Sequence, residues 1–282
     1  MKAKLLLFLM VFSSLFICFS CKKSNTSTDN DTSHLLINNT AEVLSNDVFK
    51  TVLYAWMEME DSLYHPNDTS NFHTNESCME LSLTPFDTTT TPKTLTISFP
   101  NSSCNCNDGL QRSGTISVQV SGLLSKVDSY FRATFNSFMI DSKLISGSKN
   151  LSIIYSKTGK DIVFNDTSNM SIQFGTAPYQ WDATHVVDWA LGTATHTYMY
   201  DNVFYYNGKS STAPFIGINS GIGSFNSNII QSLIFSNSCF WLHSGTVEVM
   251  PSNLPIRTVH YSDTCMQHAT YVVNNETFDV NF

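Results

Sequence analysis

The sequence predicts a mainly β protein: an antiparallel β-sandwich or an extended meander sheet, with one N-terminal helix packed on it. From Met79 onward, apolar residues recur with a period of two in short runs rich in β-branched and aromatic residues. Turn strings such as Asp108-Gly109 and Asn207-Gly208 separate these runs. Only 13% of the 282 residues are charged, which argues against long surface helices.

The one stretch with a helical pattern lies near the N-terminus, at residues 37–66. Thr40 is a candidate N-cap, and Val48, Val52 and Trp56 recur with the spacing of one helix face. The pattern ends just before Pro66, which disfavours helical backbone in the residue ahead of it. Its apolar and aromatic stripe predicts packing onto a sheet.

The remaining chain, residues 78–282, is expected to form the β-rich domain. The order strand, cysteine loop, turn and strand occurs twice, and this weak internal repeat indicates two related halves near 78–160 and 161–282. The expected strands are 81–84, 94–99, 114–121, 129–140, 181–189, 193–200, 203–206, 229–235, 239–249, 257–261, 270–273 and 278–282.

The first twenty residues have the pattern of an export signal. Two lysines precede the apolar run 5–19, which is shorter than the about 20 apolar residues that a membrane-spanning helix needs. Ser20-Cys21 follows, and a small residue before a cysteine at this place resembles a lipobox, the signal of bacterial lipoproteins. The resemblance implies that Cys21 becomes the first residue and carries acyl chains such as palmitate. We therefore expect a lipid-anchored protein of the cell envelope, at the outer membrane.

Loss of residues 1–20 would change the charge and the organisation of the chain. It removes two lysines, so that 13 Lys and Arg oppose 23 Asp and Glu and the net charge goes from -8 to −10. An acidic chain argues against a nucleic-acid partner. Residues 21–36, polar after the lipidated cysteine, are expected to form a flexible tether. The expected partners are the membrane, through Cys21, and an envelope glycan or protein.

Five cysteines would remain besides the lipidated one, and outside the cytoplasm such cysteines form disulfides more often than metal sites. They fall into two groups: Cys78 with Cys104 and Cys106, and Cys239 with Cys265. A bridge within either group would close a loop of about 26 residues and contribute about 3 kcal/mol of stability. Zinc binding and reduced thiols are the alternatives, but a Cys-x-Cys spacing is tighter than that of a zinc knuckle. One cysteine of the first group would be left over. The candidates are Cys78, Cys104, Cys106, Cys239 and Cys265.

Several of these features occur together in one known group of proteins. The chain combines an Asn-Asp-Val-Phe string at residues 46–49 with a Cys…Asp-Gly-x-x-Arg-x-Gly hairpin at residues 104–114. In this it resembles a family of uncharacterised Bacteroidota lipoproteins. The resemblance implies the compartment and the fold, and no activity. It also implies that Asp108 and Gly109 form a structural turn, which Arg112 crosses to a carboxylate or a carbonyl. A calcium site at this turn is the weaker alternative.

No catalytic motif is found, and we expect neither enzymatic activity nor a cofactor or metal. The string at residues 217–224 is rich in glycine but lacks the helix of a nucleophile elbow and the lysine of a phosphate loop. The alternative activity is an envelope glycan hydrolase with carboxylates such as Asp182, Asp188 or Asp201. Such an enzyme needs two carboxylates about 5–10 Å apart in a cleft.

A second alternative function, glycan binding, depends on aromatic residues gathered in one third of the chain. Aromatic rings exposed together on a sheet face can stack on sugar rings, whereas rings at alternate strand positions more often form the core. The sequence therefore favours a non-catalytic envelope lipoprotein with a structural or binding role. The aromatics that would bind a glycan are Trp181, Trp189, Tyr198, Tyr200 and Trp241.

Overall fold

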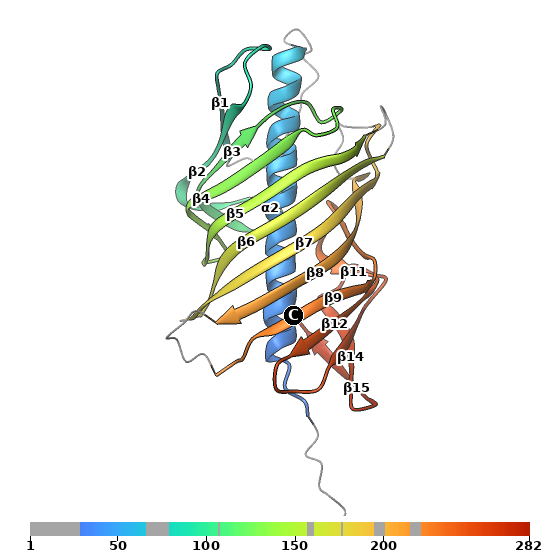
Figure 1. Ribbon diagram of the computed structural model, residues 1–282. Helices are drawn as coiled ribbons and strands as arrows, with labels where there is room; N and C mark the ends of the chain where they lie inside the picture. Colours follow the sequence, from blue (N-terminus) through green and yellow to red (C-terminus); the bar gives the residue numbers. More distant parts are fainter. Residues whose placement is uncertain are drawn as a thin grey trace, which may run out of the picture. The chain divides into compact units, whose positions relative to one another are not determined.

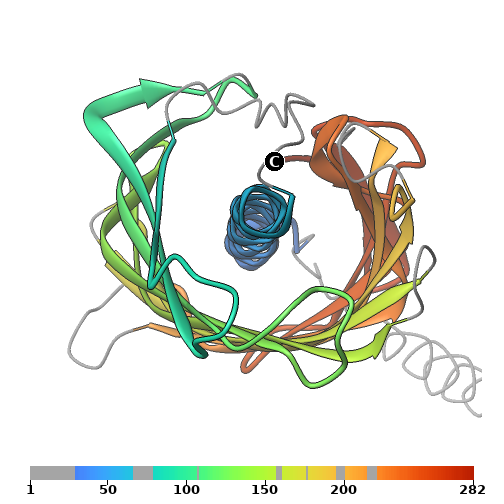
Figure 2. The ribbon, with the colours of Figure 1, turned by 90° about the horizontal axis from the view of Figure 1, so that it is seen from above.

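One antiparallel sheet curls around one long helix (Figures 1 and 2). The computed structural model describes residues 29–65, 79–106, 108–156, 161–175, 177–194, 201–214 and 221–282, with the backbone alone for residues 100–105. Two units divide the chain, Met1–Asn30 and Asp31–Phe282, and every described helix and strand belongs to the second. The mainly β prediction with an N-terminal helix is confirmed, and of its two alternatives the meander is correct, because the described strands form one sheet.

The strands follow one another through the sheet almost in chain order. The order is β1-β2-β3-β4-β5-β6-β7-β8-β9-β12-β13-β14-β15, while β10 pairs with β8 and β11 pairs with β10. The bounds are β1 Glu80–Thr84, β2 Lys93–Asn105, β3 Gln111–Val120, β4 Tyr130–Ile140, β5 Lys143–Ser156, β6 Ile162–Phe174, β7 Ala177–Leu191, β8 Val203–Pro214, β9 Phe225–Gln231, β10 Leu233–Ser236, β11 Cys239–His243, β12 Thr246–Pro251, β13 Arg257–Tyr261, β14 His268–Val273 and β15 Glu276–Asn281.

The helix, α2, spans Ser33–Tyr64 and begins earlier than the sequence predicts. The backbone N–H of Ser33 donates to the Asp31 carboxylate, 2.9 Å away. Thr40 is no N-cap, because its hydroxyl donates to the Leu36 carbonyl inside the helix. Residues 33–36, which we assigned to the tether, are therefore helical. The helix ends at Tyr64, close to the predicted end just before Pro66.

The helix is buried on all its sides, not along one stripe. Every residue from position 41 to position 49 is buried, and nine consecutive residues cover more than two full turns of a helix. Figure 2 shows the reason: the sheet surrounds α2 on several sides. Phe49, for example, meets Phe164 of β6 and Phe204 of β8 edge to face, at centroid distances of 5.3 and 5.4 Å.

The strands differ from the prediction mainly in the middle of the sheet. Two long strands, β5 and β6, were not predicted, and they pair directly across the boundary between the two expected halves. The run 239–249 is two strands, because Ser244 and Gly245 have φ of 58° and 85° and turn the chain. Residues 229–235 likewise belong to β9 and β10. Of the strand expected at 193–200, residues 193–194 form a turn and the rest lie outside the described residues.

Candidate functional site

Three clusters of buried charged and polar side chains join α2 to the sheet. The first is centred on Arg112 of β3, which is 2% exposed. Its guanidinium donates to both carboxylate oxygens of Asp47 in α2, at 3.1 and 2.6 Å. It also donates to both oxygens of Asp108, at 3.1 and 2.6 Å. Arg112 therefore crosses the Asp108-Gly109 turn to a carboxylate, as the sequence implies, and links this turn to the helix.

The contact with Arg112 lowers the pKa of the Asp108 carboxyl. Burial alone would raise the pKa of its carboxyl, but the hydrogen bonds and the charge of Arg112 outweigh burial, and the pKa lies below its ordinary value. The backbone N–H of Leu110 also donates to Asp108 and closes the turn. Gly109, with φ of +85°, provides the left-handed backbone that this turn needs.

The second cluster is centred on Lys149 of β5, which is 1% exposed. Its ammonium group donates to Asp166 of β6 and to Ser45 of α2, both at 2.7 Å, and to Ser168 at 3.2 Å. The three N–H bonds of the ammonium are thus used, and the charge is balanced by one carboxylate. The cluster fixes the register of β5 against β6 and holds both to the helix.

The third cluster surrounds Glu42 of α2. Tyr206 of β8 donates to one oxygen of the carboxylate at 3.0 Å, and Ser210 donates to the other at 3.4 Å. The Nε2 of His185 lies 3.5 Å from the carboxylate. Burial, followed by the charge of Glu42, raises the pKa of Tyr206 well above its ordinary value, so that its proton stays on the phenol.

These clusters contain groups that could in principle move protons, but they are sealed from solvent. Glu42, His185 and Lys149 are each exposed by 2% or less. A substrate would have to displace the helix to reach them. Their hydrogen bonds join α2 to the sheet, which is a structural role.

The opposite, outward face of the sheet carries a groove of about 720 Å³. It crosses β6, β7, β8, β9 and β12 and is lined by polar side chains in two rows. The first row pairs Asp182 with Ser211, and Ser211 with Asn226. In the second row Lys209 pairs with Thr184 and with Asn228, and Asn228 pairs with Glu248.

The charged groups of this groove are open to a ligand. Within the part of the chain that the structure describes, Lys209 and Glu248 form no ion pair. Asp182 accepts hydrogen bonds from the side-chain amides of Asn169 and Gln180, which fix its orientation without neutralising its charge. The groove therefore combines hydroxyl, amide, carboxylate and ammonium groups on a sheet whose other face is held by the helix.

The three described tryptophans of the predicted glycan-binding face do not stand together at the surface. Trp181 and Trp189 are 0% and 2% exposed, on the inward side of β7, so the expectation that they stack on a sugar is wrong. Their alternation reflects the core instead. Trp241 is half-buried and packs against the core. Tyr198 and Tyr200 lie outside the described residues.

The carboxylates predicted for a hydrolase are not placed as a pair. Asp182 and Asp188 are six residues apart on the same strand, about 20 Å at the rise of a β-strand. Asp201 precedes β8, which begins at Val203, and is not a cross-strand partner of either aspartate. Burial, followed by the charge of Asp161, raises the pKa of Asp188, but Asp182 is too far along β7 to act with it on one glycosidic bond.

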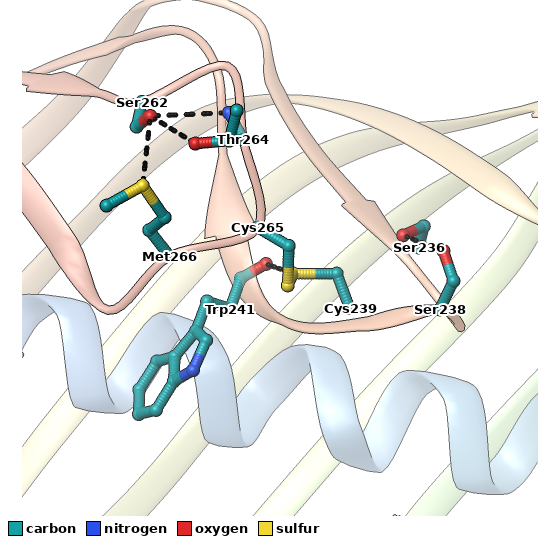
Figure 3. The surroundings of a disulfide bond; sticks show 8 residues. All are labelled: Ser236, Ser238, Cys239, Trp241, Ser262, Thr264, Cys265 and Met266. Carbon is teal, nitrogen blue, oxygen red and sulfur yellow. Dashed lines mark hydrogen bonds between the residues drawn. A yellow bond between two sulfur atoms is a disulfide. The ribbon is translucent and has the colours of Figure 1, made fainter.

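One of the predicted disulfides is present, between Cys239 and Cys265 (Figure 3). It joins the start of β11 to the loop between β13 and β14, and the Sγ of Cys239 lies 3.3 Å from the Trp241 carbonyl. In the first group, Cys106 is buried beside the Asp108 turn. The other candidates of this group, Cys78 and the side chain of Cys104, lie outside the described residues.

The lipidation site Cys21 lies outside the described residues as well. Among the described residues, no helix has the length and apolarity to cross a membrane. The described side chains also contain no group of three or more His, Cys, Asp or Glu placed to hold a metal ion.

Sequence reasoning missed Lys149, Asp166, Glu42 and the groove. The signal for the first two was present: Lys149 shares the inward phase of β5 with Leu151, and Asp166 that of β6 with Phe164. A charge at an apolar phase on each of two neighbouring strands indicates a buried pair. The groove has no such signal, because Ser, Thr and Asn at outward positions are ordinary.

Comparison of the chain with models of known protein families, with the sequences of characterised proteins and with solved structures finds no match.

Proposed function

We propose that the chain is a lipid-anchored protein of the cell envelope that binds a ligand at the outer groove and does not transform it. The anchor is Cys21, which follows an apolar export signal and precedes a polar segment. One acyl chain holds a protein only marginally, while two or more anchor it stably, so a multiply acylated cysteine suffices.

The observation that carries the binding role is the division of polar groups between the two faces of the sheet. On the inner face, Glu42, Lys149 and Arg112 are buried, and each takes part in hydrogen bonds that link the helix to a strand. On the outer face, Lys209 and Glu248 are free of ion pairs with the described residues and line a groove. The inner contacts therefore support rigidity, and the outer groups support recognition.

The spacing of carboxylates in the groove favours binding over hydrolysis. Asp182 and Glu248 are separated by three strand-to-strand steps, about 14 Å. Acid–base hydrolysis of a glycosidic bond uses carboxyl groups about 5–10 Å apart. The two carboxylates can therefore contact different parts of one extended ligand, rather than the two sides of one bond.

The anchor is tested by metabolic labelling with palmitate in cells that export the full chain. The wild type and a Cys18→Ala control, which changes a cysteine inside the signal, are expected to take up label and to fractionate with membranes. Cys21→Ala is expected to lose both the label and the membrane fraction. Equal labelling of Cys21→Ala and the wild type would overturn the anchor.

A further inference from the structure

The outer groove allows the chemical class of its ligand to be narrowed, if the proposed binding function holds. The groove spans five neighbouring strands, about 19 Å from β6 to β12. Its outward side chains supply both donors and acceptors over this length, and Met250 is the one large apolar side chain among those that line it. A ligand that fills the groove must therefore form hydrogen bonds along an extended path.

The ligand must meet side chains rather than backbone. Each strand of the floor is paired on both sides, as β8 is with β7 and β9, so its N–H and C=O groups are already used. A peptide that adds itself to a sheet edge needs unpaired backbone groups, which this part of the sheet does not offer. Recognition falls to Asp182, Lys209, Asn228 and Glu248.

The charges of the groove argue against a polyanionic ligand, and its polar lining argues against an apolar one. One ammonium, on Lys209, faces two carboxylates, on Asp182 and Glu248, and a polyanion such as a nucleic acid or a sulfated glycan needs an excess of cations. A lipid or another apolar ligand needs an apolar, largely enclosed surface. An extended, uncharged ligand rich in hydroxyl groups fits this lining best.

We propose that this groove binds an uncharged oligosaccharide through side-chain hydrogen bonds. A carboxylate accepts two hydrogen bonds side by side, so Glu248 fits a pair of neighbouring sugar hydroxyls. The Oδ1 of Asp182 already accepts from Asn169 and Gln180, which leaves its Oδ2 to accept from a further hydroxyl. Lys209 and Asn228, on the two strands between those of Asp182 and Glu248, donate to ring and hydroxyl oxygens. The floor is held in place from behind, because Ser210 and Ser227 bond to each other and Ser210 bonds to Glu42 of the helix.

The experiment uses the acylated full chain in a detergent without a sugar headgroup. The protein is screened on an array of neutral and anionic glycans, and oligosaccharides from mannan, cellulose and galactan are then titrated calorimetrically, with heparin oligosaccharides as the polyanion. Glu248→Gln and Lys209→Met are the test variants. Glu276→Gln on β15 and Lys126→Met, in the loop before β4, make the same changes at exposed positions away from the groove.

We expect at least one neutral oligosaccharide to bind, with an affinity about tenfold weaker in each test variant, which is about 1.4 kcal/mol, and unchanged in each control. Binding of anionic glycans alone, or equal weakening in test and control variants, would overturn it. If no glycan binds while Cys21 still takes up palmitate, the oligosaccharide proposal fails and the anchor stands. If envelope extract also yields no ligand, the binding function fails too.

Discussion

Replacing Arg112 by methionine should remove the buried charge that joins α2 to the Asp108 turn. The guanidinium makes four hydrogen bonds to two carboxylates, and its removal leaves Asp47, which is 2% exposed, as a buried charge without that partner. Breaking a buried ion pair from one side costs about 3–5 kcal/mol. For a domain of this size each kcal/mol shifts the unfolding temperature by about 2–4 °C, so we expect a fall of about 6–20 °C.

Thermal unfolding followed by tryptophan fluorescence measures this fall, because Trp56, Trp181 and Trp189 are buried and report on the core. The control is Arg132→Met: Arg132 is exposed and stacks over the Tyr130 ring, so its loss should cost about 0.5–1 kcal/mol.

A double variant separates an unpaired charge from a loss of packing. Arg112→Met with Asp47→Leu replaces both members of the pair by apolar groups, while Asp108, 35% exposed, can turn to water. Such replacements are often neutral, so the double variant should recover most of the lost stability. The reasoning is refuted if Arg112→Met costs less than about 1 kcal/mol, or if the double variant is no more stable than the single one.

Two further predictions concern the backbone and the pH dependence of stability. Gly109 and Gly114 share a φ of +85°, but of the two only Gly114 would bring a Cβ against backbone, that of Ser137. Gly109→Ala should therefore lower the free energy of unfolding by about 1–2 kcal/mol, and Gly114→Ala by about 1–3 kcal/mol more. Equal unfolding temperatures of the two variants would contradict this. Burial, and then the charge of Glu42, raises the pKa of Tyr206 and Tyr261 above the ordinary value, so the unfolded state releases these protons first as pH rises. Stability should fall above about pH 10 by about 1.4 kcal/mol per pH unit for each tyrosine, and urea unfolding at stepped pH should show a shallower fall in Tyr206→Phe.

The sequence predicts the sheet well where the inward residues are apolar. The run 181–189 alternates strictly, because its inward positions hold tryptophan, alanine, histidine and valine, and it is part of β7 as expected. The strands β5 and β6 escaped prediction because polar residues occupy inward positions: Lys149, Asp166 and Ser168 interrupt the apolar phase on which the reading of strands depends. They are stable in the core because they bond to one another and to the helix, a long-range fact that no local window contains.

The same reason shortened the predicted helix. A helix that packs on one face of a sheet has an apolar stripe, and Asn38, Asn39 and Glu42 interrupt this stripe. The sequence therefore assigns residues 33–36 to the tether and places the N-cap at Thr40. In the structure each of these residues is buried and bonded to a strand, as Asn39 is to Tyr261 at 3.1 Å. A helix enclosed by a sheet meets partners on every side, and its sequence then lacks the usual two-faced pattern.

The link between Asp47 and Arg112 could have been predicted in part. Both belong to the strings that carry the family resemblance, at residues 46–49 and 104–114, and Arg112 was expected to find a carboxylate. Its principal partner lies 65 positions away along the chain, and only the folded structure brings the two together. The groove depends even more on the fold, because its residues come from five strands and carry no shared motif.

We propose that the inner polar groups build the sheet and that the outer ones bind the ligand. The most direct test compares two variants, Arg112→Met and Glu248→Gln, for the affinity of one neutral oligosaccharide and for the unfolding temperature. We predict that Arg112→Met unfolds at a lower temperature but binds like the wild type while folded, and that Glu248→Gln keeps the unfolding temperature but binds about tenfold more weakly. Unchanged binding by Glu248→Gln, or loss of binding in folded Arg112→Met, would contradict the account.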